Sequence, residues 1–180
     1  MSFRSCAALG AVACALLLAF GYYLQYAQGL DPCPLCLVQR GFFYGVMAVF
    51  LAAAAHGPKA RAAALYSCLV FLFGLGGAAA AGRQVWLQQL PPDKVPQCGP
   101  DLFFMLENFP LSRTLEKLFY GTGECAVVDW SFLGLSIAGW SLAWFVAFCV
   151  YALWLAIRAL RSSRISSANT SPINITTAPR

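Results

Sequence analysis

The sequence is poor in charge. Only 11% of its 180 residues are Asp, Glu, Lys or Arg, whereas a soluble domain has roughly a quarter. So few charges cannot cover the surface of a compact domain against water, so much of the outer surface must face lipid. The basic residues are scattered singly and form no stripe, which argues against a nucleic acid partner.

Long stretches lack charge altogether, and they define four apolar blocks at residues 7–27, 37–55 (with Arg40 near its start), 62–82 and 133–157. Each block approaches the roughly 20 residues that a spanning helix needs. The sequence therefore predicts an all-α membrane protein, a four-transmembrane-helix bundle formed by residues 1–161. The Ser/Thr/Asn-rich residues 162–180 are predicted to be a disordered tail.

The first block could alternatively be a signal peptide, since Arg4 precedes an apolar run. No small-x-small cleavage site follows Phe20, and the block is long enough to span, so a retained anchor is the favoured interpretation.

The basic residues are distributed unequally over the two sides of the predicted bundle. Seven lie near the termini or in the second connection, whereas the other two connections, 30–36 and 83–132, hold four. The positive-inside rule then predicts that both termini are cytoplasmic and that the connections 30–36 and 83–132 lie outside; we call these two the outer connections. All seven acidic residues fall in the two outer connections or at their edges.

The eight cysteines fall into two groups. Four lie in or beside apolar blocks, where a thiol packs as a small hydrophobe; they are Cys6, Cys14, Cys68 and Cys149. The other four, Cys33, Cys36, Cys98 and Cys125, lie in the outer connections. Four cysteines allow three pairings, and the spacing favours Cys33 with Cys36 and Cys98 with Cys125. A zinc site made by these four is a non-enzymatic alternative.

The first outer pair forms a C-x-x-C at the start of the second block. Pro34 favours a helix start, so we expect Cys36 in the first helical turn. The helix N-terminus and Arg40, one turn further on, would both favour the thiolate of Cys36. An arginine inside a span indicates function by default; the alternative is that Arg40 reaches out to the lipid headgroups.

The second outer connection contains half of the prolines and is predicted to be turn-rich. Within it, the segment Leu111–Tyr120 has apolar residues at i, i+4, i+7 and i+8. This pattern predicts a short helix on the outer membrane surface. A small helix packed on the bundle is the alternative.

These motifs together resemble the DsbB family of bacterial inner-membrane disulfide-forming proteins. The resemblance rests on Cys33-Pro-Leu-Cys36 followed by Arg40, on the later pair Cys98 and Cys125, and on Trp130-Ser-Phe-Leu-Gly134 before the last span. It implies a membrane thiol:quinone oxidoreductase that reoxidises a periplasmic, DsbA-like thioredoxin-fold oxidase. It also implies ubiquinone or menaquinone as electron acceptor, and a multi-pass inner-membrane location with periplasmic active cysteines.

The resemblance also implies roles for the residues. Cys98 would form the mixed disulfide with the partner, and Cys125 would be its pair. Cys33 would exchange with that pair, while Cys36 would lie next to the quinone and Arg40 would stabilise the reduced oxygens and thiolate.

The chain departs from some relatives, which carry a histidine where Gln84 stands; its only histidine, His56, is expected at the opposite end. We expect Gln84 to donate a hydrogen bond to a quinone carbonyl, or else to face the headgroups. A vitamin-K-epoxide-reductase-like protein is the second enzymatic interpretation, but its C-x-x-C would be expected late in the bundle. No metal is expected in either enzyme.

Overall fold

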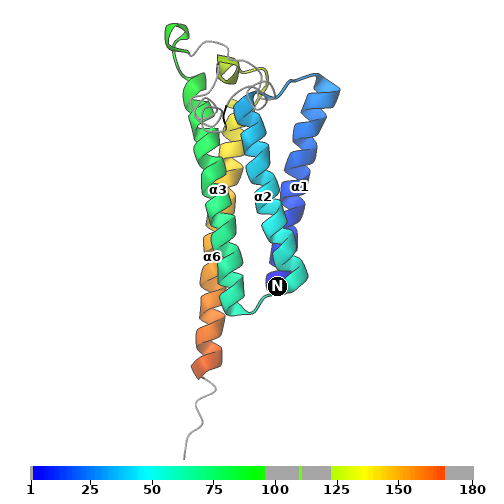
Figure 1. The fold of residues 1–180 in the computed structure, drawn as a ribbon, viewed down its shortest axis with the longest axis vertical. Helices are drawn as coiled ribbons and strands as arrows, with labels where there is room; N and C mark the ends of the chain where they lie inside the picture. The colour runs from blue at the N-terminus through cyan, green and yellow to red at the C-terminus, as the bar shows by residue number, and fades with distance from the viewer. Residues whose placement is uncertain (1, 96–109, 111–122, 169–180) are drawn as a thin grey trace, which may run out of the picture.

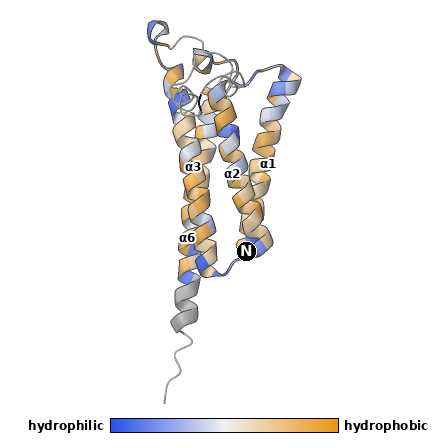
Figure 2. Ribbon diagram, in the orientation of Figure 1, coloured by the Kyte–Doolittle hydropathy of each residue, from blue (hydrophilic) through white to orange (hydrophobic). Residues whose placement is uncertain are grey.

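The computed structural model describes residues 2–95, 110 and 123–168. Four long helices dominate this part of the chain and run alternately up and down (Figure 1): α1 (Phe3–Gln28), α2 (Pro34–His56), α3 (Ala60–Gln88) and α6 (Ile137–Ala168). All four contain a segment long and apolar enough to cross a membrane, and hydrophobic residues cover their middle turns (Figure 2). The predicted four-helix membrane bundle is confirmed.

Local sequence signals fix the helix ends. The Ser2 hydroxyl accepts a hydrogen bond from the Ser5 amide at the start of α1, and Pro34 occupies the first turn of α2. Both α1 and α2 stop at a glycine with positive φ, Gly29 and Gly57, a conformation that costs glycine little.

Aromatic rings and glycines make the helix contacts. Phe43 of α2 stacks on Phe145 of α6 at 4.1 Å between ring centroids. A Cβ placed on Gly77 of α3 would overlap the Phe145 ring, so the absence of a side chain there lets α3 and α6 approach closely. These two helices share the most extensive contact in the bundle.

The helices extend past the predicted ends of the blocks, but α6 begins at Ile137, four residues after the predicted start at 133, because residues 133–136 form the turn and second strand of a hairpin. α3 continues from residue 82 to Gln88, and α6 reaches Ala168, which includes the start of the predicted disordered tail. Polar residues ended the predicted blocks, but extending a formed helix is far easier than starting one. The outer connection therefore begins six residues later than residue 83, at Gln89.

Short elements link α3 to α6: η1 (Pro92–Lys94), η2 (Gly123–Ala126) and a hairpin of β1 (Ser131–Phe132) and β2 (Leu135–Ser136). Leu133 and Gly134 both have positive φ, as a tight primed hairpin turn requires. The predicted surface helix at Leu111–Tyr120 lies outside the described residues.

The four cysteines assigned to packing have different surroundings. Cys6 and Cys14 are buried in the core, and Cys149 is half-buried. Cys68 is exposed on α3, so its predicted packing role is wrong. The apolar character of the surrounding block did not show which face of α3 carries Cys68.

Candidate functional site

The Cys33-Pro-Leu-Cys36 segment lies where α2 begins. Cys33 is the residue that precedes the first turn, and Cys36 lies within that turn, as predicted. Both are thiols, and the Cys33 Sγ donates a hydrogen bond to the Cys36 Sγ at 3.1 Å. A disulfide needs about 2.05 Å between sulfurs, so the pair needs only a small approach to form a bridge when an oxidant removes two electrons and two protons.

Cys125 reaches the same place from the other outer connection. It lies on η2, is fully buried, and packs with Leu35 of α2 and Leu87 of α3. Its side chain is hydrogen-bonded to Cys33, and this bond, followed by the bond to Cys36 and by burial, raises the pKa of Cys33. Cys33 therefore holds its proton and contacts a sulfur on each side.

Gln84 of α3 faces the two sulfurs at the start of α2. Its Nε2 lies 3.3 Å from the Sγ atoms of both Cys33 and Cys36, and the Cys36 thiol lies 3.6 Å from its Oε1. The side chain is buried. The alternative that Gln84 faces the headgroups is therefore wrong, because the packing of α3 on α2 turns this position inward.

Sequence reasoning missed a second amide in this network. Gln39 is buried on α2, and its Nε2 donates to the Gln84 Oε1 at 2.6 Å. This bond fixes which way the Gln84 amide points and aims its N–H₂ group at the sulfurs. The available signal was a glutamine inside an apolar span, three residues after Cys36.

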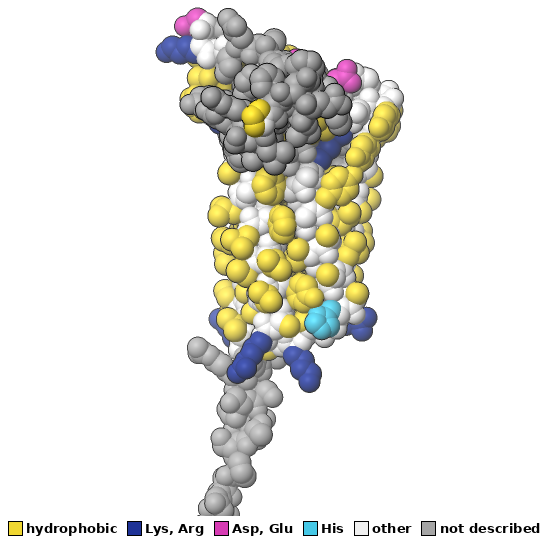
Figure 3. All heavy atoms as spheres, in the orientation of Figure 1, with side chains coloured by type: hydrophobic (Ala, Val, Ile, Leu, Met, Phe, Trp, Pro, Cys, Tyr) yellow, Lys and Arg dark blue, Asp and Glu magenta, His cyan; other side chains and the backbone are white. Residues whose placement is uncertain are grey.

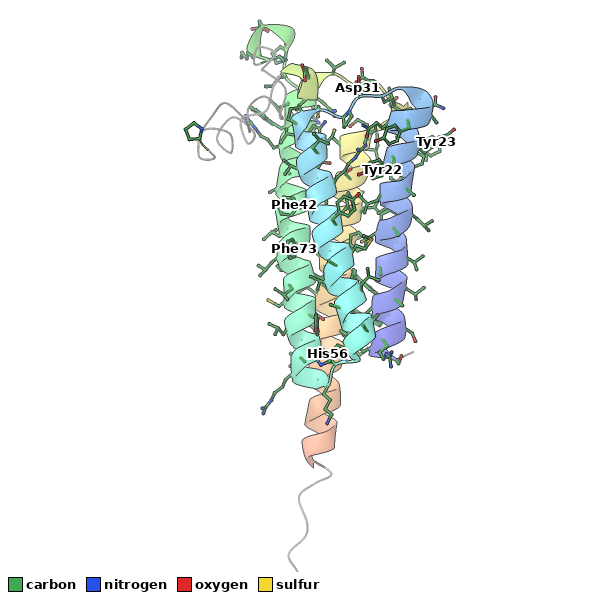
Figure 4. The ribbon with its side chains drawn as sticks, turned by 45° about the vertical axis from the view of Figure 1, so that its right-hand side comes forward. Tyr22, Tyr23, Asp31, Phe42, His56 and Phe73 are labelled. Carbon is green, nitrogen blue, oxygen red and sulfur yellow. The ribbon has the colours of Figure 1, made fainter. Side chains whose placement is uncertain are left out.

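Arg40 is directed to α1. Its guanidinium donates to the Gln25 Oε1 and to the Gly21 carbonyl oxygen, and its Cζ lies 4.8 Å from the centre of the Tyr22 ring. The side chain is half-buried. Arg40 thus ties the outer ends of α1 and α2 together; Tyr22 marks this region in Figure 4.

The structure brings together three of the four predicted redox cysteines, Cys33, Cys36 and Cys125, with Gln84 beside them. Cys98 lies outside the described residues. We call this end of the bundle the cysteine end. His56 lies at the other end, as predicted (Figures 3 and 4), and bonds to the Tyr66 hydroxyl.

The Trp130–Gly134 segment leads into the hairpin before α6 and contacts α1. The Trp130 ring meets Phe20 of α1 edge-on at 5.8 Å and stacks on Phe132. Ser136 donates to Gln88 of α3 at 2.7 Å, and Trp140 donates to the Phe132 carbonyl oxygen. The hairpin therefore connects α1, α3 and α6 around an apolar, aromatic margin.

This arrangement is suited to thiol–disulfide exchange. A sulfur relay needs a thiolate that can reach a disulfide sulfur and a second sulfur to leave, and Cys33 has a neighbouring sulfur on either side. Amide N–H groups next to a sulfur stabilise its anionic form. The site thus combines a three-sulfur contact with fixed donors at the edge of a membrane span.

Known proteins match nearly the whole chain. The family described as "Disulfide bond formation protein DsbB" matches residues 3–155. A "Disulfide bond formation protein B" of Nitrosococcus oceani is 51% identical over 146 residues, covering 81% of this chain and 86% of the relative. The protein of that name in Hahella chejuensis is 53% identical over 143 residues, covering 79% and 86%, and that of Methylococcus capsulatus is 49% identical over 160 residues, covering 87% and 98%.

The C-x-x-C opens α2, where the vitamin-K-epoxide-reductase-like alternative did not expect it. The chain belongs to the DsbB family: it is a multi-pass membrane oxidoreductase of disulfide bond formation.

Proposed function

We propose that this protein is a thiol:quinone oxidoreductase that reoxidises a DsbA-type periplasmic dithiol and passes its electrons to ubiquinone or menaquinone. The observation that carries the proposal is the contact of Cys33 with both Cys36 and Cys125. It supports an exchange between the two outer connections, which a structural bridge in either connection would not need.

The proposed sequence conserves atoms and electrons. A thiolate of the partner attacks Cys98 of a Cys98–Cys125 bridge and releases Cys125 as a thiolate. Cys125 then attacks Cys33 of a Cys33–Cys36 bridge, which forms a Cys33–Cys125 bond and frees the Cys36 thiolate. The partner's second thiolate then attacks its own sulfur in the mixed disulfide and releases Cys98, and Cys98 attacks Cys125, which restores the Cys98–Cys125 bridge and frees Cys33. The two electrons and two protons of the partner dithiol are then held by Cys33 and Cys36, and one quinone would accept them.

The surroundings of Cys36 fit a quinone. The ring would find an apolar margin near Trp130 and Phe20, and Gln84 and Arg40 would hold its oxygens as hydrogen-bond donors. Bound quinone supplies a two-electron acceptor for the thiolate. Gln84 contributes a donor that already contacts the Cys36 sulfur, and Gln39 keeps that donor oriented.

The proposed orientation puts the cysteine end in the periplasm and both termini in the cytoplasm, in a bacterial inner membrane. The far end carries Arg4, Lys59, Arg61 and Arg158, and their gathering there supports this orientation (Figure 3). Cysteine labelling of intact cells from outside tests it: Cys98 should react after reduction, whereas a cysteine introduced at Lys59 should not.

The function is tested by anaerobic mixing of the purified protein with a reduced DsbA-type partner and a short-chain quinone, following quinone absorbance. Cys36→Ser should abolish quinone reduction and still let Cys98 form a mixed disulfide with the partner. Cys68→Ser, the same change at an exposed thiol away from the network, should turn over normally. Normal turnover of Cys36→Ser would refute the proposed electron path.

A further inference from the structure

The hairpin of residues 131–136, which we call the outer hairpin, exposes large apolar side chains. Phe132 is 54% and Leu133 is 78% exposed, and Leu135 and the preceding Val127 and Val128 are exposed as well. A cluster of this kind on a connection between helices marks a surface that meets either lipid or another protein. The depth of the hairpin in the membrane decides between these two.

Helix α1 gives that depth from one side. Trp130, which directly precedes the outer hairpin, meets the ring of Phe20 edge-on at 5.8 Å. Arg4 is exposed at the far end of α1, and it marks the far edge of the hydrocarbon layer because charged side chains at a helix end stay among the headgroups. From Arg4 to Phe20 the helix rises ~24 Å, whereas the layer is ~30 Å thick. Phe20 therefore lies within the hydrocarbon layer, and Trp130 reaches its margin at the cysteine end.

Helix α6 gives the same depth from another side. The Trp140 indole N–H donates a hydrogen bond to the Phe132 carbonyl oxygen at 3.1 Å, and the two rings lie 6.3 Å apart. From Trp140 to Arg158, a basic residue at the far end, α6 rises ~27 Å, again less than the ~30 Å thickness of the layer. Phe132 thus packs at the same margin, where tryptophan is enriched in membrane proteins.

The residue at the turn of the outer hairpin favours lipid as well. Leu133 has a φ of 52°, whereas a tight primed turn usually has Asn, Asp or Gly at this position, because these residues adopt a positive φ at lower cost. The turn itself therefore does not explain a leucine, but an apolar surround for its side chain does. The two strands pair with each other, which leaves fewer backbone groups open to lipid.

We propose that the outer hairpin inserts the side chains of Phe132 and Leu133 into the bilayer leaflet at the cysteine end. The hairpin is joined through residues 127–130 to η2, which carries Cys125. Insertion therefore anchors the end of the second outer connection to the membrane and holds the segment with Cys125 close to the start of α2. The partner of this surface is the lipid itself, and the anchor is independent of the proposed electron path.

Photo-crosslinking in nanodiscs of phosphatidylethanolamine and phosphatidylglycerol tests the contact. The full chain carries p-benzoylphenylalanine in place of one residue, and mass spectrometry identifies what is attached after irradiation. The probe at Leu133 should give lipid adducts at a yield close to that of the probe at Leu153, which is half-exposed on the spanning part of α6.

Lys94 is the control position for the crosslinking. It is exposed on η1 in the same connection, but it follows α3, which rises ~42 Å from Ala60 to Gln88 and so ends outside a hydrocarbon layer of ~30 Å. The probe at Lys94 should give no lipid adducts above the unirradiated background.

Leu133→Asn separates insertion from a role in the turn alone. Asparagine suits a primed turn better than leucine, so a residue with only a turn role would give slower hydrogen exchange in this variant. Loss of an inserted leucine should instead make the amides of residues 124–132 exchange roughly tenfold faster in nanodiscs, equivalent to ~1.4 kcal/mol. Asp129→Asn, at an exposed position of the same segment, should keep the exchange within about twofold of the wild type.

The melting temperature checks that each variant folds. Three results would overturn the proposal. The first is an absence of lipid adducts at Leu133 when Leu153 gives them. The second is attachment at Leu133 to residues 96–122, or to an added DsbA-type protein, in place of lipid. The third is hydrogen exchange in folded Leu133→Asn that is as slow as in the wild type or slower.

Discussion

At the scale of single residues, the chemistry at the cysteine end depends on which side chains are hydrogen-bonded to one another. Cys33 donates to Cys36 and is hydrogen-bonded to Cys125, whereas the Gln84 amide is held by Gln39. The sequence could predict Cys36 in the first turn, because Pro34 is a local signal. It could not predict the Gln39–Gln84 bond, which depends on how α2 and α3 pack. It could not decide whether Arg40 has a functional role or reaches out to the lipid headgroups, because an arginine at that depth can bind either a neighbouring helix or the headgroups.

The state of Cys33 should be visible in its reactivity. Its raised pKa keeps it protonated at pH 8, where an ordinary thiol is partly thiolate. In the reduced protein, iodoacetamide should therefore modify Cys33 at least roughly tenfold more slowly than glutathione, with a rate still rising above pH 9. Cys125→Ala removes the largest cause of the raised pKa and should speed the reaction at pH 8. Peptide mass spectrometry measures it, and a rate for wild-type Cys33 equal to that of glutathione would contradict the hydrogen bonding.

Gln84 and Arg40 should affect the quinone and not the protein partner. A hydrogen bond to a charged group contributes about 1.5–3 kcal/mol, so Gln84→Leu or Arg40→Ala should raise the apparent KM for quinone roughly tenfold or more. Capture of the partner by Cys98 should stay unchanged. Gln28 is an exposed glutamine on α1 at the cysteine end of the bundle, so Gln28→Leu serves as the control. An unchanged KM in Arg40→Ala would leave Arg40 with only its role of joining α2 to α1.

At the scale of elements, the apolar blocks predicted how many helices there are and not where they end. Their borders were set at the first polar residues, but α3 and α6 continue through such residues. Helix pairing was also beyond the sequence, because membrane helices pack through small residues whose partners lie far away in the chain. Gly77 against Phe145 is such a contact.

This contact predicts a difference between two glycines of the same helix. Gly77→Ala would place a Cβ against the Phe145 ring, and overpacking of this kind costs about 1–3 kcal/mol. Gly82→Ala meets no atom within 4 Å and should change the unfolding free energy by less than about 1 kcal/mol. Thermal unfolding in detergent compares the two. A loss of stability at Gly82 equal to that at Gly77 would contradict the α3–α6 contact as the cause, because alanine favours a helix more than glycine does and meets no atom at position 82.

At the scale of the whole molecule, the two ends differ in chemistry. The sulfurs of the site lie at one end and Lys and Arg side chains gather at the other, while the apolar middle joins them (Figures 2 and 3). This division was predictable, because spans and charges can be counted along a chain. The meeting of Cys125 with the start of α2 was not, since it requires η2 to fold back onto α2 and α3; only the resemblance to the DsbB family implied it.

The proposed electron path depends on an exchange of disulfide between Cys33 and Cys125. In Cys36→Ser/Cys98→Ser, mild oxidation with copper phenanthroline and non-reducing peptide mapping should reveal a Cys33–Cys125 bridge in most molecules. The same variant with Cys33→Ser added should keep Cys125 as a free thiol. If oxidation left both Cys33 and Cys125 unbridged in the folded double variant, the proposed path of electrons between the two outer connections would be contradicted.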